Sequence, residues 1–211
     1  MAKCYPANLI VERQDCLVVG GGKTAERKVA ALLEAGAVVR VVAREAGAKL
    51  TNMAAAGQIT LAVRDAEEAD LGDALVVILA TDDEALNRRL AAAAKARRQL
   101  VNVVDVPELC TFYVPASIRR GPMLLTVGSD GAAPSLTKHL RERIDEQFGE
   151  EWGELAEIMG ELRDTVKARF ATQPERAAAW ERVLASSALE LSRAGRKAEA
   201  RRVAEEAVTA S

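Results

Sequence analysis

The sequence CLVVGGGKTAER, residues 16–27, decides the fold because it joins a short apolar strand to a helix through three glycines. Its pattern G-x-G-x-x-A, from Gly20 to Ala25, is typical of a loop that binds a dinucleotide. Gly20 allows a tight turn, Gly22 lets the backbone approach a pyrophosphate, and the small Ala25 lets the helix pack closely on the strand. Free N–H groups and the positive end of the helix dipole then favour phosphates at this point.

The residues after the glycines indicate a parallel sheet covered by helices. Val29, Leu32 and Leu33 form one helical face. Gly36 then ends the helix, and residues 38–42 predict the next buried strand. The alternative interpretation is a glycine turn in an α/β domain that binds no ligand there. The candidate cofactor-binding residues of the loop and first helical turn are Gly20, Gly21, Gly22, Lys23, Thr24 and Ala25.

The choice between NAD and NADP depends on the tip of that second strand. An acidic residue about twenty residues beyond the glycines normally binds the ribose 2′-OH of NAD. Ala43 stands at this tip and is a candidate cofactor contact. Glu45, slightly later, can substitute for the missing acid, whereas Arg44 can favour the 2′-phosphate of NADP. NAD is the expected cofactor.

Composition places the chain among globular proteins with a full core. Its 211 residues fit a nucleotide-binding domain with a smaller appendage. The net charge of −2 is spread over both signs, which gives no signal for nucleic acid or an anionic membrane. Because no apolar run reaches the roughly 20 residues that span a bilayer and no signal pattern opens the chain, we expect a cytoplasmic protein. Cys4, Cys16 and Cys110 are far apart, which predicts neither disulfides nor a zinc site.

Strands and helices alternate through the first half of the chain. The expected helices are residues 45–56 and 84–97, and the expected strands are residues 59–63, 75–80 and 100–104. Such alternation implies right-handed crossovers and a parallel sheet, whose ligand crevice lies at the carboxyl ends of its strands.

Several candidate residues should meet at that edge. Gly20, Ala43, Thr81 and Asp105 each end or follow a strand. Thr81 and the adjacent Asp82 are candidates for cofactor contact, with a simple helix cap as the alternative. Asp105 lies at the fifth strand tip, beside the expected nicotinamide, and its alternative role is a cap on the next turn.

The pattern changes after residue 110. Residues 111–114 and 124–127 are expected to form short strands separated by a turn at 120–122. Residues 129–134 lead into a helix for which Pro134 suits the first position.

Apolar stripes predict helices through the rest of the chain, and they are most simply core. The last stretch, residues 196–211, has only a thin apolar face and is expected to fray in part. We therefore expect an α/β protein with a Rossmann-like nucleotide-binding domain over residues 1–110, a small α+β segment over 111–149 and a helical domain over 150–211. The first stripe consists of Trp152, Leu155, Met159, Leu162, Val166 and Phe170.

Four short stretches carry a resemblance to a known family. They are CLVVGGGKTAERK at 16–28, ATDDEALN at 80–87, NVVDVP at 102–107 and VGSDGAAP at 127–134. Together they resemble the precorrin-2 dehydrogenase family of siroheme biosynthesis, whose members oxidise precorrin-2 to sirohydrochlorin with NAD and in some cases also insert ferrous iron. The chain looks like the short, stand-alone form, because nothing resembling a methyltransferase domain follows its helical tail.

The resemblance implies a role for individual residues. The catalytic aspartate of the family falls on Asp105, and the serine of its glycine-rich segment falls on Ser129, a candidate substrate contact. The chain departs from many relatives at Gly128, Ala132 and Ala133, where they carry serine or threonine. The resemblance also implies a homodimer, formed through the segment from residue 111 to 148.

The carboxylate-rich tetrapyrrole precorrin-2 requires cations in its pocket. The densest basic group forms the candidate substrate site, with a solvated helix face as the alternative. His139 is the single histidine and also a candidate base or iron ligand. Because one histidine cannot build a preformed metal site, insertion of ferrous ion would use the macrocycle nitrogens with Asp105 assisting. The basic candidates are Arg119, Arg120, Lys138, His139 and Arg141, with Arg143 beside them.

Two functional interpretations follow. The first is NAD-dependent oxidation of precorrin-2, with Asp105 as base or orienting carboxylate. The second is an NAD(H)-sensing regulatory module without turnover. The sequence Asn102 to Asp105 argues against the second, because a sensor has no evident need for a carboxylate at the nicotinamide end.

Overall fold

The computed structural model describes residues 3–210, and the chain divides into two compact units between Val114 and Pro115. The division lies slightly beyond the boundary expected after residue 110. Within residues 3–210, no helix is long and apolar enough to cross a membrane.

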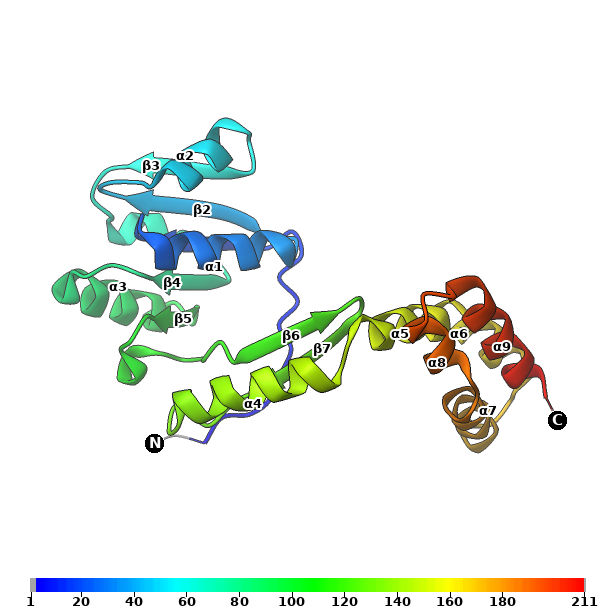
Figure 1. The fold of residues 1–211 in the computed structure, drawn as a ribbon. Helices are drawn as coiled ribbons and strands as arrows, with labels where there is room; N and C mark the ends of the chain where they lie inside the picture. The colour runs from blue at the N-terminus through cyan, green and yellow to red at the C-terminus, as the bar shows by residue number, and fades with distance from the viewer. Residues whose placement is uncertain (1–2, 211) are drawn as a thin grey trace. The chain divides into compact units, whose positions relative to one another are not determined.

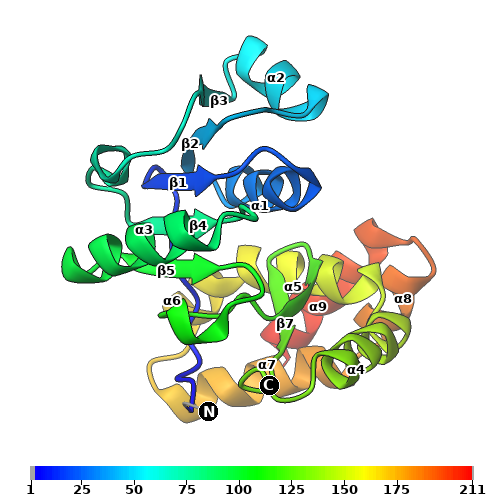
Figure 2. The same ribbon diagram turned by 90° about the vertical axis from the view of Figure 1, so that its left-hand side faces the viewer.

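The first unit is built on a parallel sheet of five strands in the order β3-β2-β1-β4-β5 (Figure 1). Figure 2 shows the five strands stacked in this order. Successive strands are added on one side of β1 up to β3 and then on its other side from β4, so the topological switch point lies between the ends of β1 and β4. The strands are β1 (Asp15–Val19), β2 (Val38–Ala43), β3 (Ile59–Val63), β4 (Val76–Leu79) and β5 (Leu100–Val103).

Helices cover both faces of this sheet, because successive side chains of a strand point to opposite faces. Cys16 and Val18 of β1 pack with Val29 and Leu50 in one core. Leu17 on the other face packs into a second core with Leu90 and Ala91. The first core lies under α1 (Lys23–Glu34) and α2 (Ala48–Ala55), and the second under the short turn η1 (Glu68–Leu71), α3 (Glu84–Ala96) and η2 (Pro107–Leu109).

The predicted elements of this unit are confirmed with two corrections. The helix expected from residue 45 begins only at Ala48, because the preceding loop packs against the glycine turn and Gly47 N–H donates to Gly21 O at 3.0 Å. Residues 111–114 form no strand. Thr111 N–H bonds Val101 O at 2.8 Å, and the Asn102 amide donates to Phe112 O at 3.2 Å, so isolated contacts tie this segment to β5.

The second unit begins with the antiparallel hairpin β6 (Ala116–Arg120) and β7 (Met123–Val127). Its turn contains Gly121 at φ +50°, a conformation that favours glycine. The next helix, α4 (Pro134–Gln147), has Pro134 in its first turn, as expected, but none of its residues is buried.

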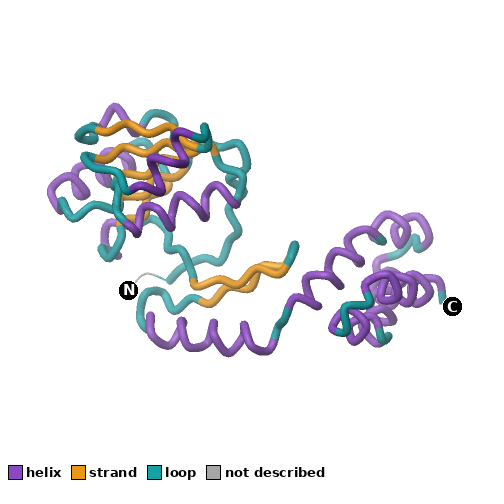
Figure 3. The backbone as a smooth tube through the Cα atoms, turned by 45° about the horizontal axis from the view of Figure 1, so that its top comes forward, coloured by secondary structure: helices purple, strands orange, loops and turns teal. Residues whose placement is uncertain are grey.

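Five further helices pack around a separate core (Figure 3). Leu155, Leu162 and Val166 of the predicted stripe are buried in it. The prediction of a frayed end was wrong for the part of 196–211 that the structure describes, because the last helix buries Ala200 and Ala204. The helices are α5 (Glu150–Glu161), α6 (Arg163–Arg169), α7 (Gln173–Ala185), α8 (Ala188–Arg193) and α9 (Lys197–Thr209).

Candidate functional site

The glycine turn is fixed by the close approach of protein backbone. Gly20 has φ +127°, and a Cβ there would lie 2.2 Å from Ala80 O. A Cβ on Gly21 would lie 1.8 Å from Glu45 O. Gly20 N–H also donates to Val42 O at 2.9 Å. The first two glycines therefore let the loop fit between the ends of β2 and β4.

Gly22 differs from the other two glycines. A Cβ at this position would meet no protein atom within 4 Å, and its φ of −84° suits any residue. Gly22 is also the N-cap of α1, and no side chain caps the helix there. The open space thus lies at the N–H groups of a helix start, where a pyrophosphate binds. Ala25, one turn on, is fully buried, as its proposed packing role requires.

The end of β2 presents Arg44 rather than Ala43. The side chain of Ala43 is buried and its residue is only 5% exposed, so it offers little surface to a ribose. The exposed Arg44 forms ion pairs with Asp65 and Asp83. Lys23 and Gly22 are exposed at the start of α1, while Thr24 is half-buried.

Thr81 and Asp82 follow β4 at the same edge. The Thr81 hydroxyl donates to the buried Asn87 side chain at 2.8 Å, and the Asn87 amide donates back to Thr81 O at 2.8 Å. The N-cap of α3 is Asp83, whose carboxylate accepts from Leu86 N–H at 2.9 Å. The cap that we considered for Thr81 and Asp82 therefore belongs to Asp83, and Asp82 is exposed.

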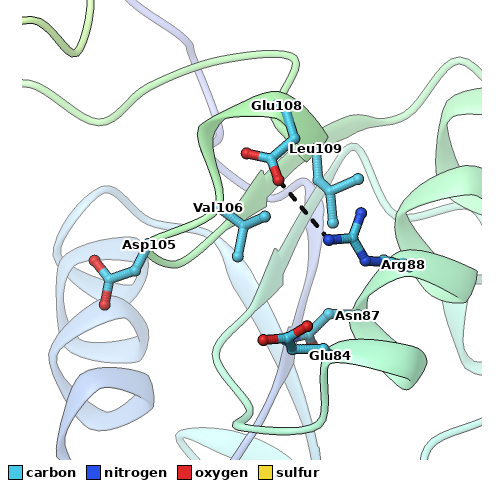
Figure 4. A pocket seen from close by; sticks show the side chains of 7 residues that line it. All are labelled: Glu84, Asn87, Arg88, Asp105, Val106, Glu108 and Leu109. Atoms are coloured by element: carbon cyan, nitrogen blue, oxygen red, sulfur yellow. Dashed lines mark ion pairs between the residues drawn. The ribbon is translucent and has the colours of Figure 1, made fainter.

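Asp105 lies just beyond β5, in a left-handed turn with φ +59°. Aspartate tolerates this conformation better than most residues, and such outliers gather at functional sites. Asp105 borders a hollow of about 220 Å³ that Asn87 and Arg88 also line. Figure 4 shows its carboxylate pointing away from the Arg88–Glu108 ion pair. The exposed carboxylate is thus held at the edge that carries the glycine turn.

The basic candidates and Ser129 belong to the second unit. Arg120 is engaged there, because its Nε donates to Phe148 O at 3.0 Å and its guanidinium pairs with Asp145 and Glu150. Its side chain is only 15% exposed. This favours a structural role for Arg120 over the substrate contact that we expected. Ser129 Oγ accepts from Ala133 N–H at 3.0 Å and thereby shapes the turn before α4.

The other basic candidates are more accessible. Lys138 and His139 are exposed on α4, and Arg119 lies on β6. The Arg141 side chain is 34% exposed and approaches Asp145 at 3.7 Å. The structure therefore groups these residues within the second unit, and it groups the cofactor candidates with Asp105 in the first. Among residues 3–210, no cluster of three or more histidine, cysteine or acidic side chains could hold a metal ion.

Comparisons with known proteins match both parts of the chain. Residues 7–116 match a family described as NAD(P)-binding, and residues 151–208 match the sirohaem synthase dimerisation region. A siroheme synthase of Nitrosospira multiformis is 42% identical over 195 residues, which cover 90% of this chain and 41% of the relative. A siroheme synthase of Methylobacillus flagellatus is 44% identical over 178 residues, which cover 84% and 38%. The chain belongs to the siroheme synthase and precorrin-2 dehydrogenase family.

A solved structure is similar to this chain over nearly its whole length. SirC, a precorrin-2 dehydrogenase, superposes with a TM-score of 0.73 at 25% identity and covers 96% of this chain and 100% of its own. The chain spans about two fifths of the length of the siroheme synthases that it matches. The matched dimerisation region lies after the segment 111–148 to which we assigned that role from sequence.

Two supporting residues near Asp105 were missed from sequence. The Cys110 thiol accepts from Val103 N–H at 3.2 Å and lies 3.4 Å from Val106 O, so it bridges the two ends of the Asp105 turn. Burial raises the pKa of this thiol, which keeps it protonated. Burial, and then Arg27, lower the pKa of Lys28, while the charge of Asp105 opposes the shift. Lys28 therefore lies within electrostatic reach of Asp105, although only the folded topology brings α1 and β5 together.

Proposed function

We propose that the chain oxidises precorrin-2 to sirohydrochlorin with NAD as hydride acceptor. The observation that carries this proposal is the exposed carboxylate of Asp105, held in a left-handed turn at the same sheet edge as the glycine turn. SirC, which matches along its whole length, is a precorrin-2 dehydrogenase. The family match to NAD(P)-binding proteins supports the cofactor.

The open space at Gly22 fits the pyrophosphate of the cofactor, and the N–H groups at the start of α1 are its donors. NAD, when bound, supplies a nicotinamide ring that accepts a hydride from the substrate. The oxidation also releases a proton from precorrin-2. Asp105 accepts this proton or orients the substrate carbon that loses it, with the Lys28 ammonium nearby.

Precorrin-2 is a carboxylate-rich substrate, and the accessible basic side chains of the second unit are the groups that would bind it. Arg119, Lys138, His139 and Arg141 keep this role in the proposal, and Ser129 lies in the turn before α4. Insertion of ferrous ion into sirohydrochlorin is the second reaction to test, because some relatives of the resembled family combine the two. The cytoplasmic location stays a prediction.

A homodimer is part of the same proposal. Leu136 and Leu140 of α4 are 55% and 42% exposed, and Leu124 of the adjoining hairpin is 39% exposed. A second copy would bury these leucines across a symmetric contact. The match of residues 151–208 to a sirohaem synthase dimerisation region supports a homodimer. It also makes the helices α5 to α9 a second candidate for the contact between the two copies.

The test is incubation of the full chain with precorrin-2 and NAD, followed through the absorbance of sirohydrochlorin. Gly22→Asp should weaken NAD binding by tenfold or more, because it places a carboxylate where the phosphates lie. Gly160→Asp is the matched control, since its Cβ also meets no atom within 4 Å but it lies in α5. Binding of NADH without turnover would instead support the sensing module. Repeating the assay with ferrous ion tests the chelation step.

A further inference from the structure

We propose that Asp65 and Asp83 set the cofactor preference of this site by occupying Arg44, which otherwise would bind the 2′-phosphate of NADP. The inference rests on the proposed function, because it concerns the same dinucleotide site. It goes further by naming the side chains that select NAD in a chain without the usual acidic residue at the tip of the second strand.

Arg44 lies where the 2′-position of the adenosine ribose is read in this fold. It follows the last residue of β2, and the preceding Val42 O accepts from Gly20 N–H at 2.9 Å. The loop after Arg44 returns to the glycine turn, where Gly47 N–H donates to Gly21 O at 3.0 Å. The end of the second strand is the place where an acid binds the 2′-OH, or an arginine binds the 2′-phosphate. An unpaired Arg44 would therefore favour NADP.

Two carboxylates from different segments hold the Arg44 guanidinium. Its Nε donates to Asp65, and its Nη2 donates to Asp83 at 3.2 Å. Asp65 is fixed beside β2 because Arg64 N–H bonds Ala43 O at 2.9 Å. Asp83 is fixed because it caps α3. The backbone positions of both carboxylates are thus held by regular secondary structure, next to β2 for Asp65 and at the start of α3 for Asp83.

The directions in which the pKa values of Arg44 and Asp83 shift agree with this geometry. Hydrogen bonding to Asp65, followed by its charge, raises the pKa of Arg44. The Leu86 N–H, together with the Arg44 charge, lowers the pKa of Asp83. Asp83 therefore stays ionised at neutral pH, and the Arg44 guanidinium faces the carboxylates of Asp65 and Asp83. A 2′-phosphate would have to displace one carboxylate and approach the other, whereas a 2′-OH adds no charge.

The cluster is open to solvent, since the Arg44 and Asp65 side chains are 66% and 72% exposed. The distance over which exposed charges act on each other in water is about 10 Å at 0.1 M salt, and this distance shortens as the salt concentration rises. The discrimination against the 2′-phosphate should therefore weaken as ionic strength rises.

The experiment measures dissociation constants of NADH and NADPH on the full chain by fluorescence titration. The key variant is Asp65→Asn with Asp83→Asn, because asparagine keeps the side-chain shape and still caps a helix well. We expect NADPH affinity to rise by about tenfold or more, as a freed arginine binds a phosphate, while NADH affinity changes less than twofold. Adding Arg44→Ala to the double variant should remove the gain. Asp73→Asn, compared with each of the single variants Asp65→Asn and Asp83→Asn, controls for the loss of one negative charge, since Asp73 lies before β4 at the other end of the sheet.

Each other outcome overturns the inference in a distinguishable way. If the double variant binds NADH normally but keeps the wild-type ratio, the carboxylate pair does not select the cofactor and the proposed function stands. If Asp73→Asn produces the same gain, overall charge is responsible. If the wild-type chain prefers NADPH, Arg44 already binds the phosphate. If it binds neither dinucleotide, the proposed function fails as well.

Discussion

The helices α1 and α4 begin in similar ways, but their side chains are buried to different extents. Each follows a strand and a glycine-containing turn. α1 buries Ala25 and Val29 completely, whereas α4 buries none of its residues and leaves Leu136 55% exposed. The core of the sheet unit therefore covers one face of α1, while the hairpin and α4 leave an apolar surface open. This difference accords with the proposed roles, in which the first unit holds the cofactor and the second contributes substrate contacts and assembly.

The largest effect is expected from replacing Asp105, the proposed catalytic carboxylate of the sheet unit. Asp105→Asn should lower turnover by about 100-fold or more, because the amide cannot accept a proton. NADH affinity should stay unchanged. Asparagine also tolerates the left-handed φ of +59°, whereas alanine would add backbone strain. The measurement is steady-state oxidation of precorrin-2, with a titration of NADH.

Asp130→Asn is the matched variant in the second unit, because Asp130 has a similar φ of +53°. Its loss of turnover should be much smaller. An equal loss in both variants would break the division of roles between the units. Near-normal turnover of Asp105→Asn, with a large loss in Asp105→Ala, would make Asp105 an orienting residue.

The second prediction concerns the open apolar surface of α4. Leu136→Glu with Leu140→Glu should weaken the homodimer by about tenfold or more for each leucine, since burying a leucine contributes about 1.5 to 3 kcal/mol. Sedimentation velocity over a range of concentrations would measure this. Leu184→Glu is the comparison variant, because Leu184 is also 55% exposed but lies on α7, within the region that matches the dimerisation family. If only Leu184→Glu dissociates the protein, the interface lies within residues 151–208 instead.

The third prediction separates binding from structure among the basic residues of the second unit. Arg141→Ala should raise the KM for precorrin-2 about two- to fivefold with little change in kcat, the range expected of exposed ion pairs. Arg120→Ala should instead lower the free energy of unfolding by roughly 1 to 3 kcal/mol, because it leaves the Phe148 carbonyl and Asp145 without their donor. Kinetics and urea denaturation of both variants test this. The opposite pattern would return Arg120 to the substrate site.

Local signals in the sequence were sufficient for most of the sheet unit. The strand at residues 59–63 was predicted at its observed limits, and Gly20 was assigned the tight turn that its φ of +127° requires. Residues 111–114 were misjudged because a short run of threonine, aromatic and β-branched residues resembles a strand. The last helix was underestimated because its buried side chains are small, with Ala200 and Ala204 in the core.

Contacts between distant residues could not be predicted. Arg44 reaches partners 21 and 39 residues away, and Arg120 meets Asp145 at a separation of 25 residues. Only the order of strands in the folded sheet brings the first set together. Periodicity records which face of an element is apolar, but it carries no information about which charged side chains from other elements lie beside it.

The last prediction tests how completely the sheet unit encloses its core. Cys16 of β1 is fully buried, and burial raises the pKa of its thiol from 9.0 to about 11. The thiol therefore stays protonated in the folded chain at a pH where it ionises in the unfolded chain. Stability from this difference is present below pH 9 and is lost as the pH rises toward 11, so the free energy of unfolding should fall across this window.

Urea denaturation at several pH values, followed by circular dichroism, would measure this fall. Cys16→Ala should flatten part of it, because the variant has no thiol to ionise, although its stability at pH 7 is lower through the lost packing. Cys4→Ala should keep the wild-type slope, since Cys4 is exposed. If the Cys16→Ala curve runs parallel to that of the wild type between pH 9 and 11, water reaches β1 and the sheet unit is less closed than α1 and its buried Val29 indicate.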